Sequence, residues 1–196
     1  MDKSISRFAL PASLDALPDD LRERILAVQD KAGFIPNVFL MLAHRPEEFR
    51  AFFAYHDALM DRVSDTLTQA EKEMIVVAVS ADHGCLYCVV AHGAILRILA
   101  KDAQLADQLA VNYQTASITL RQRTMLDFAL HLAARRGVLD DVWQARLEEQ
   151  GFSLDDIWDI GAIAGIFGLS NRLVSMARTP PNDEFYLLGR VPRAAK

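Results

Sequence analysis

The chain has 196 residues, of which 52% are hydrophobic and 24% are charged, and its formal net charge is −5. This composition is typical of a mildly acidic globular protein with one sizeable core, and the lack of a basic run argues against a nucleic-acid partner. No stretch reaches the roughly 18 uncharged apolar residues of a membrane span, and no signal peptide is recognised, so we expect a cytoplasmic protein without a membrane anchor.

Apolar residues recur at three- and four-residue steps through nearly the whole chain, which predicts an all-α fold. Acidic helix starts, prolines at first turns and Ser/Thr caps divide this pattern into about eight to nine helices. We expect them from 19 to the break at Gly33, and over 38–42, 46–63, 68–82, 85–99, 103–113, 119–134, 140–149 and 153–176. The run 75–79 has a strand-like composition, but it follows a capping box and has no second strand to pair with.

No low-complexity linker divides the chain, so we expect a single domain over 1–196. Pro180-Pro181 ends the last helix, and 182–196 is interpreted as an extended C-terminal arm. Four apolar residues at 185–188 make this arm unsuited to lie free in water. We therefore expect it to pack on the body of the protein or on a neighbouring subunit.

Both cysteines of the chain lie in one motif, Cys85-Leu86-Tyr87-Cys88, and His92 follows four residues later. On a helix Cys85, Cys88 and His92 share one stripe, because their spacing is i, i+3 and i+7. The thiolate is the reactive form of cysteine, and a helix N-terminus favours it. Two thiols in a first helical turn, with an imidazole in reach as their base, predict redox chemistry at this site.

Glu73 is the expected acid partner of this base. It lies early in the helix that precedes the turn at His83-Gly84, and two helices joined by so short a turn can run antiparallel. Glu73 would then face His92 and fix the tautomer of its ring through a hydrogen bond. Ser80 lies on the same stripe as Glu73, and its hydroxyl either points toward the thiols or bonds back to its own helix.

Three interpretations near the motif stay open. His83 is a turn residue that either handles a proton or only packs, and Tyr87 either shapes the pocket with a hydrogen bond or packs. The two cysteines with His83 and His92 are also ligand types for zinc. Structural zinc sites usually take ligands from separated segments, however, and these four lie within ten residues. We expect no metal and no other cofactor.

The remaining histidines, His44, His56 and His131, have no chemical neighbours in the sequence and are expected to pack or to lie at the surface. Asn171-Arg172 interrupts an apolar helix. Because a buried arginine needs a partner, we expect a salt bridge from Arg172 to another helix or subunit.

Glu73, then Cys85-Leu86-Tyr87-Cys88, then His92 resembles the active-site signature of the AhpD-like alkylhydroperoxidases in the carboxymuconolactone decarboxylase superfamily. The flanking sequence is also similar, with Gly-Phe-Ile-Pro-Asn-Val at 33–38 before an apolar helix and Gly-Phe-Ser at 151–153 before a late one. The resemblance covers roughly 30–180 and is greatest to the peroxidase-related subgroup.

This resemblance implies an AhpD-like helical bundle, assembled as a trimer or hexamer, that acts as a cofactor-free thiol peroxidase. It implies that Cys88 attacks the hydroperoxide, that Cys85 resolves the product into a disulfide, and that His92 and Glu73 form a proton relay. An external dithiol or a lipoyl-bearing protein would reduce the disulfide. AhpD itself often has a histidine where this chain has Tyr87. A non-redox enzyme of the decarboxylase type, and a redox-sensing or zinc-binding helical oligomer, remain as alternatives.

Overall fold

The computed structural model describes residues 4–134 and 138–190. Within these ranges the chain forms nine α-helices, three short 3₁₀ helices and no strand, which confirms the all-α prediction. The α-helices are α1 (Asp19–Ala32), α2 (Asn37–Leu42), α3 (Pro46–Met60), α4 (Gln69–Asp82), α5 (Leu86–Ala100), α6 (Leu105–Asn112), α7 (Leu120–Ala133), α8 (Asp141–Glu149) and α9 (Leu154–Ala177).

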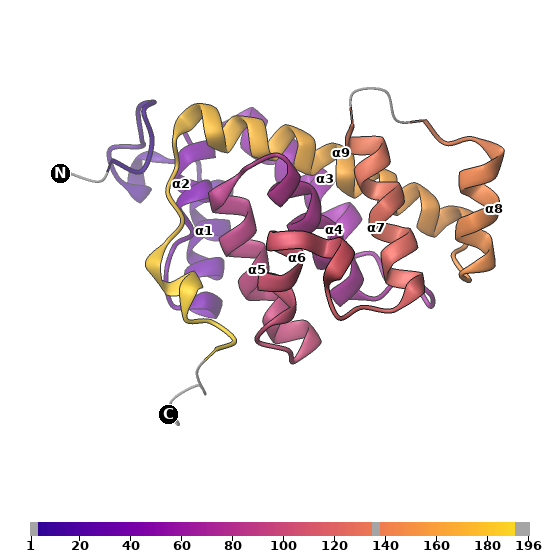
Figure 1. The fold of residues 1–196 in the computed structure, drawn as a ribbon. Helices are drawn as coiled ribbons and strands as arrows, with labels where there is room; N and C mark the ends of the chain where they lie inside the picture. The colour runs from indigo at the N-terminus through magenta and orange to yellow at the C-terminus, as the bar shows by residue number, and fades with distance from the viewer. Residues whose placement is uncertain (1–3, 135–137, 191–196) are drawn as a thin grey trace.

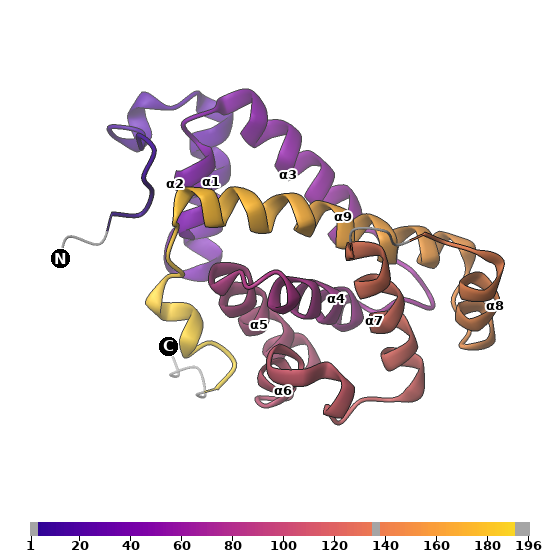
Figure 2. The ribbon, with the colours of Figure 1, turned by 45° about the horizontal axis from the view of Figure 1, so that its top comes forward.

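Helix α4 lies at the centre of the fold. It packs against α5, α6, α7 and α9, and ten of its 14 residues are buried. Figures 1 and 2 show α9 running along the length of the molecule, from α8 at one end to α1 and α2 at the other. The run 75–79 lies inside α4 as helix, as expected, because burial on all sides suits its β-branched residues without any sheet.

The starts of three helices are fixed by local chemistry. Thr68, Thr119 and Ser153 each form a capping box at the start of α4, α7 and α9, so that side-chain oxygens satisfy backbone N–H groups that have no partner within the helix. Asp156, the acid of the third box, is fully buried.

The end of α3 is fixed by a buried charge on α4. The Nζ atom of Lys72, whose side chain is fully buried, donates hydrogen bonds to the carbonyl oxygens of Leu59 (2.7 Å) and Arg62 (2.6 Å). The Leu59 carbonyl is one of those that a helix C-terminus leaves without partners, and the Arg62 carbonyl belongs to the loop that follows. The helix ends at Met60, and Val63, which the sequence pattern assigned to it, is 84% exposed.

Helix α9 is long and apolar enough to cross a membrane, with a mean hydropathy of 1.4 over its most apolar window. The sequence analysis found no such stretch, because it required a run free of charged and polar residues. In the structure 56% of that window is buried, and α9 packs on α3, α4 and α7. Its apolar composition is that of a core helix.

The C-terminal segment is not extended throughout, because residues Asp183–Tyr186 form a 3₁₀ helix. This segment packs on α5 and is held there by the buried Arg97, which donates hydrogen bonds to the carbonyls of Phe185 (2.8 Å) and Leu188 (2.9 Å). Phe185 and Leu188 thus pack on the body of the same chain, whereas Tyr186 and Leu187 are 45% and 61% exposed. The end of the expected arm, 191–196, lies outside the described residues.

The cap of α9 predicts an acid-sensitive contribution to stability. Burial alone would raise the pKa of Asp156, but hydrogen bonds from Ser153, Ser64 and Thr66 outweigh it and lower this pKa to about 2. Since the ordinary pKa of an aspartate is 3.8, the carboxylate stabilises the fold fully above about pH 4, and this contribution is lost as the pH falls toward about 2.

We expect Asp156→Asn to lower the free energy of unfolding at neutral pH by about 2 kcal/mol and to flatten its pH dependence between about pH 2 and pH 4. Urea unfolding followed by circular dichroism at several pH values measures both. An unchanged pH dependence in the variant would contradict the assignment.

Candidate active site

Helices α4 and α5 form a hairpin whose turn positions the two cysteines. Gly84 adopts a left-handed backbone conformation (φ +66°), which favours glycine, and the N–H of Cys85 then donates to the carbonyl of Ser80 at 2.9 Å. Cys85 is the N-cap residue of α5, one position before the helix itself begins at Leu86. The motif therefore lies at a helix N-terminus, where backbone N–H groups favour a thiolate.

Both thiols are buried and reduced. They lie in the smaller of the two core clusters, which gathers the N-terminal helices α1, α2 and α3 over the start of α5 and the end of α9. The net effect of the surroundings is to lower the pKa of Cys85 to about 7. The neighbouring Cys88 thiol is the largest cause, the Cys88 backbone N–H, the Ser175 hydroxyl and the charge of His92 add to it, and burial opposes them.

The interaction with Cys85 raises the pKa of Cys88, and burial raises it further. Among the described residues, the Cys88 thiol has one side-chain polar contact, with the Ser170 hydroxyl at 4.0 Å. The family resemblance implies that His92 and Glu73 act on the attacking thiol, Cys88. The surroundings of the pair favour the loss of the first proton from Cys85 instead.

Glu73 and His92 meet across the hairpin, as the sequence spacing suggested. The Oε2 atom of Glu73 lies 2.8 Å from Nδ1 of His92, and the two side chains are only 7% and 15% exposed. A carboxylate accepts, so the ring donates from Nδ1, and its Nε2 is left free to take a proton. The His92 ring also packs edge-on against Phe167 of α9, at 4.7 Å between centroids.

Ser80 makes neither of the contacts considered from the sequence. Its hydroxyl donates to Oδ1 of Asn171 on α9 at 3.0 Å, and the Nδ2 of Asn171 donates to Nδ1 of His83 at 3.0 Å. Asn171 therefore ties the end of α4 and the turn before the motif to α9. Arg172 is exposed and bonds to the carbonyl of Gly168, and within the described part of the chain it forms no salt bridge, so the expected ion pair to another helix is absent there.

Tyr87 connects the helix of the motif to segments outside it. Its hydroxyl accepts a hydrogen bond from the N–H of Val38 at the start of α2 (3.2 Å), and its ring packs edge-on against Phe185. Burial raises the pKa of Tyr87, so the phenol stays protonated. It joins α5 to the N-terminal helices and to the C-terminal segment, which is a packing role.

The two histidines of the possible zinc set point to different partners, His83 to Asn171 and His92 to Glu73. Across 4–134 and 138–190, no group of three or more His, Cys, Asp or Glu side chains is arranged to hold a metal ion. The geometry therefore gives no support to a zinc site at the motif.

Sequence reasoning missed His56, which lies on the same side of the fold as His92. The centroids of the two imidazoles are 6.5 Å apart, and both rings contact Phe167. His56 occupies an apolar helical stripe with Phe52 and Phe53. The place of His56 in this stripe was the one signal in the sequence, but its neighbour His92 is 36 positions away, so no local pattern connects the two.

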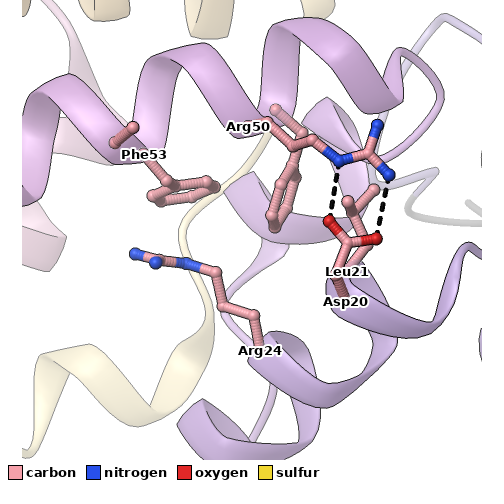
Figure 3. A pocket seen from close by; sticks show the side chains of 7 residues that line it. Asp20, Leu21, Arg24, Arg50 and Phe53 are labelled. Atoms are coloured by element: carbon pink, nitrogen blue, oxygen red, sulfur yellow. Dashed lines mark hydrogen bonds and ion pairs between the residues drawn. The ribbon is translucent and has the colours of Figure 1, made fainter.

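A pocket of about 300 Å³ lies between α1 and α3. Figure 3 shows Arg50 paired with Asp20 at one end and Arg24 extending below Phe53 at the other. The Arg24 guanidinium lies 4.7 Å from the centroid of the Phe53 ring.

Comparison with known proteins places this site in a family. The model of the carboxymuconolactone decarboxylase family matches residues 46–116, which include the Glu73, Cys85, Cys88 and His92 positions. None of the curated proteins matches the chain.

Two solved structures are similar over nearly their whole length. The uncharacterized peroxidase-related protein of Ralstonia eutropha JMP134, an alkylhydroperoxidase AhpD core, is 60% identical with a TM-score of 0.93, and the match covers 97% of this chain and 99% of that one. The peroxidase-related protein of Silicibacter sp. TM1040 is 38% identical with a TM-score of 0.89, covering 96% and 97%. The debrominase Bmp8 shares the fold at 21% identity and a TM-score of 0.76, covering 95% and 98%.

The hydrogen bond between the thiols predicts how the ionisation of Cys85 responds to its neighbour. Cys88→Ala removes the donor, so we expect the pKa of Cys85 to rise from about 7. Cys88→Ser keeps a hydroxyl donor and is expected to shift it less. The rate of alkylation by iodoacetamide as a function of pH measures the pKa in each variant. An equal midpoint in Cys88→Ala and the unaltered protein would show that the sulfurs do not interact.

Proposed function

Because the chain belongs to the AhpD-like branch of the carboxymuconolactone decarboxylase superfamily, we propose that it is a thiol-dependent hydroperoxide reductase that cycles between a Cys85–Cys88 dithiol and a disulfide. One observation carries this proposal: two buried thiols that influence each other's ionisation lie at a helix N-terminus, where the charge of His92, paired with Glu73, also lowers the pKa of Cys85. The family relationship supports an AhpD-type enzyme, and the peroxide chemistry is our inference.

The proposed reaction begins with a proton transfer. His92, held by Glu73, takes the proton of the Cys85 thiol. Cys88 then passes its own proton to the Cys85 sulfur as it attacks. This order is supported by the lowered pKa of Cys85, to which the charge of His92 contributes. It gives the two cysteines different tasks, with Cys88 as the nucleophile and Cys85 as its immediate base.

The Cys88 thiolate then attacks the terminal oxygen of the hydroperoxide. A sulfur–oxygen bond forms, the oxygen–oxygen bond breaks, and the leaving alkoxide takes a proton from His92 to become an alcohol. Cys85 next attacks the sulfenic acid, the disulfide forms, and the oxygen leaves as water with the remaining proton. An external dithiol, of small-molecule or lipoyl type, reduces the disulfide by exchange.

The superfamily's non-redox decarboxylase chemistry has no evident use for a resolving thiol. Whether turnover requires Cys85 therefore distinguishes hydroperoxide reduction from decarboxylation. A redox sensor would show the same disulfide but little turnover.

We also propose that the protein assembles as a homotrimer or homohexamer. Helix α9 is covered on one side by the core, yet Leu154, Trp158, Leu169 and Met176 are each more than half exposed on it. Apolar side chains of this size gathered along one helix are typical of a subunit interface.

The test is hydroperoxide consumption with excess dithiothreitol, comparing the unaltered protein with Cys88→Ser and Cys85→Ser. We expect both variants to lose turnover, and a sulfenic acid that reacts with dimedone to accumulate only in Cys85→Ser. Glu73→Gln, which keeps the size of the side chain, is expected to slow turnover by about tenfold or more. Undiminished turnover in Cys88→Ser would overturn the assignment of the nucleophile.

A further inference from the structure

The reductive half of the proposed cycle needs protons as well as electrons. When an external dithiol attacks as a thiolate, its two protons remain in the solvent, and it leaves as a disulfide. The Cys85–Cys88 disulfide accepts the two electrons and must gain two protons to return to two thiols. Both sulfurs are buried, so these protons have to cross the protein.

A row of polar side chains leads from His92 to the surface in two hydrogen-bonded groups, Glu73 with His92, and His56 with Asp57 and Arg24. Its members come from four different helices, α4, α5, α3 and α1. Their side chains become steadily more exposed along the row, from Glu73 (7%) and His92 (15%) to His56 (25%), Asp57 (35%) and Arg24 (36%).

The middle of this row is His56. Its Nδ1 lies 3.1 Å from Oδ1 of Asp57, and Asp57 is held in turn by Arg24 at 2.8 Å. The carboxylate accepts, so His56 donates from Nδ1 and presents a free Nε2. The imidazole of His92 is likewise tied at Nδ1 and free at Nε2.

The centroids of the two rings are 6.5 Å apart. A direct hydrogen bond needs about 3 Å between nitrogen atoms, which this distance does not allow, so a proton that moves between the rings needs a bridging water. Burial lowers the pKa of His56, and the charge of His92 lowers it further, against the opposing effects of Asp57 and Glu73. The ring is therefore neutral at neutral pH and able to accept a proton.

We infer that His56 is a proton-relay residue that carries protons from solvent to His92 while the disulfide is being reduced. His56, whose side chain is 25% exposed, takes a proton from solvent at its free Nε2 and passes it through water to Nε2 of His92, which protonates the cysteine thiolate released by exchange. The inference rests on the proposed dithiol cycle. It assigns His56 to one half-reaction, because in the oxidative half the protons of the two thiols end in the alcohol and in water.

The aromatic neighbours of His56 offer a competing, purely structural role. Phe52, Phe53 and Phe167 surround the ring at 6.2–6.3 Å between centroids, and a residue that only fills this space would affect both half-reactions alike through the fold. The test must therefore separate the two halves.

In the experiment, the disulfide is formed with diamide and then reduced by excess dithiothreitol, and free thiols are counted by rapid alkylation and mass spectrometry. The oxidative half is measured separately, by a single turnover of the reduced protein with hydrogen peroxide. We expect His56→Gln to slow reduction by about tenfold or more and to change oxidation by less than about twofold. His131→Gln, which removes a histidine on α7 bonded to the carbonyl of Val138, is the matched control and should leave both rates unchanged.

A second variant guards against a simple packing defect. His56→Ala opens a partly exposed space, and imidazole added to the buffer should restore most of the lost reduction rate in this variant alone. Unchanged reduction in His56→Gln, equal slowing of both halves, or no rescue by imidazole in folded His56→Ala would overturn the inference. Because diamide forms the disulfide without peroxide, a failure of the proposed peroxidase function would appear separately, as a reduced protein that does not react with hydrogen peroxide.

Discussion

Three consecutive charged side chains, Glu71, Lys72 and Glu73, are buried at the start of α4, and the arrangement of the surrounding helices depends on satisfying them. A buried charge is costly unless it is paired or fully hydrogen-bonded, and each of these has a partner on a different element. Glu71 pairs with Arg121 of α7, Lys72 closes the end of α3, and Glu73 pairs with His92 of α5. The pairing that holds α5 in register is therefore the same pairing that prepares the base of the site. Stability and chemistry share one contact here.

Much of this arrangement could be predicted because it is local. The capping residues Thr68 and Ser153 and the breaks near Gly33 and Gly84 act over a few residues, and the helices they delimit lie where the pattern put them. The Glu73–His92 contact could also be anticipated, since a short turn between two helices lets them run antiparallel and brings Glu73 of the first helix close to His92 of the second. The boundary at Met60 could not, because it depends on a lysine from the next helix.

The contacts that could not be predicted from the sequence are those between residues far apart in the chain. Ser80 bonds to Asn171, which is 91 positions away, and Asn171 also bonds to His83. In the Asn171-Arg172 pair it is therefore Asn171 that fixes a neighbouring segment, the turn before the cysteines. His56 gave no sequence signal beyond its place in an apolar stripe. Such contacts depend on how α3, α4, α5 and α9 cross one another, and no local pattern encodes those crossings.

The position of the cysteines at the start of α5 makes them unequal. Cys85, as the N-cap residue, lies outside the helix and can receive the N–H of Cys88, while Cys88 belongs to the first turn and has mainly Cys85 to bond with. Helix α9 adds to the difference in pKa between the two thiols, since it places Ser175 near Cys85 and Ser170 near Cys88. The cap position of Cys85 and the first-turn position of Cys88 thus favour Cys85 as the sulfur that loses its proton first. A CxxC pair in the middle of a helix would lack this asymmetry, because both N–H groups nearby would already be bonded to the preceding turn.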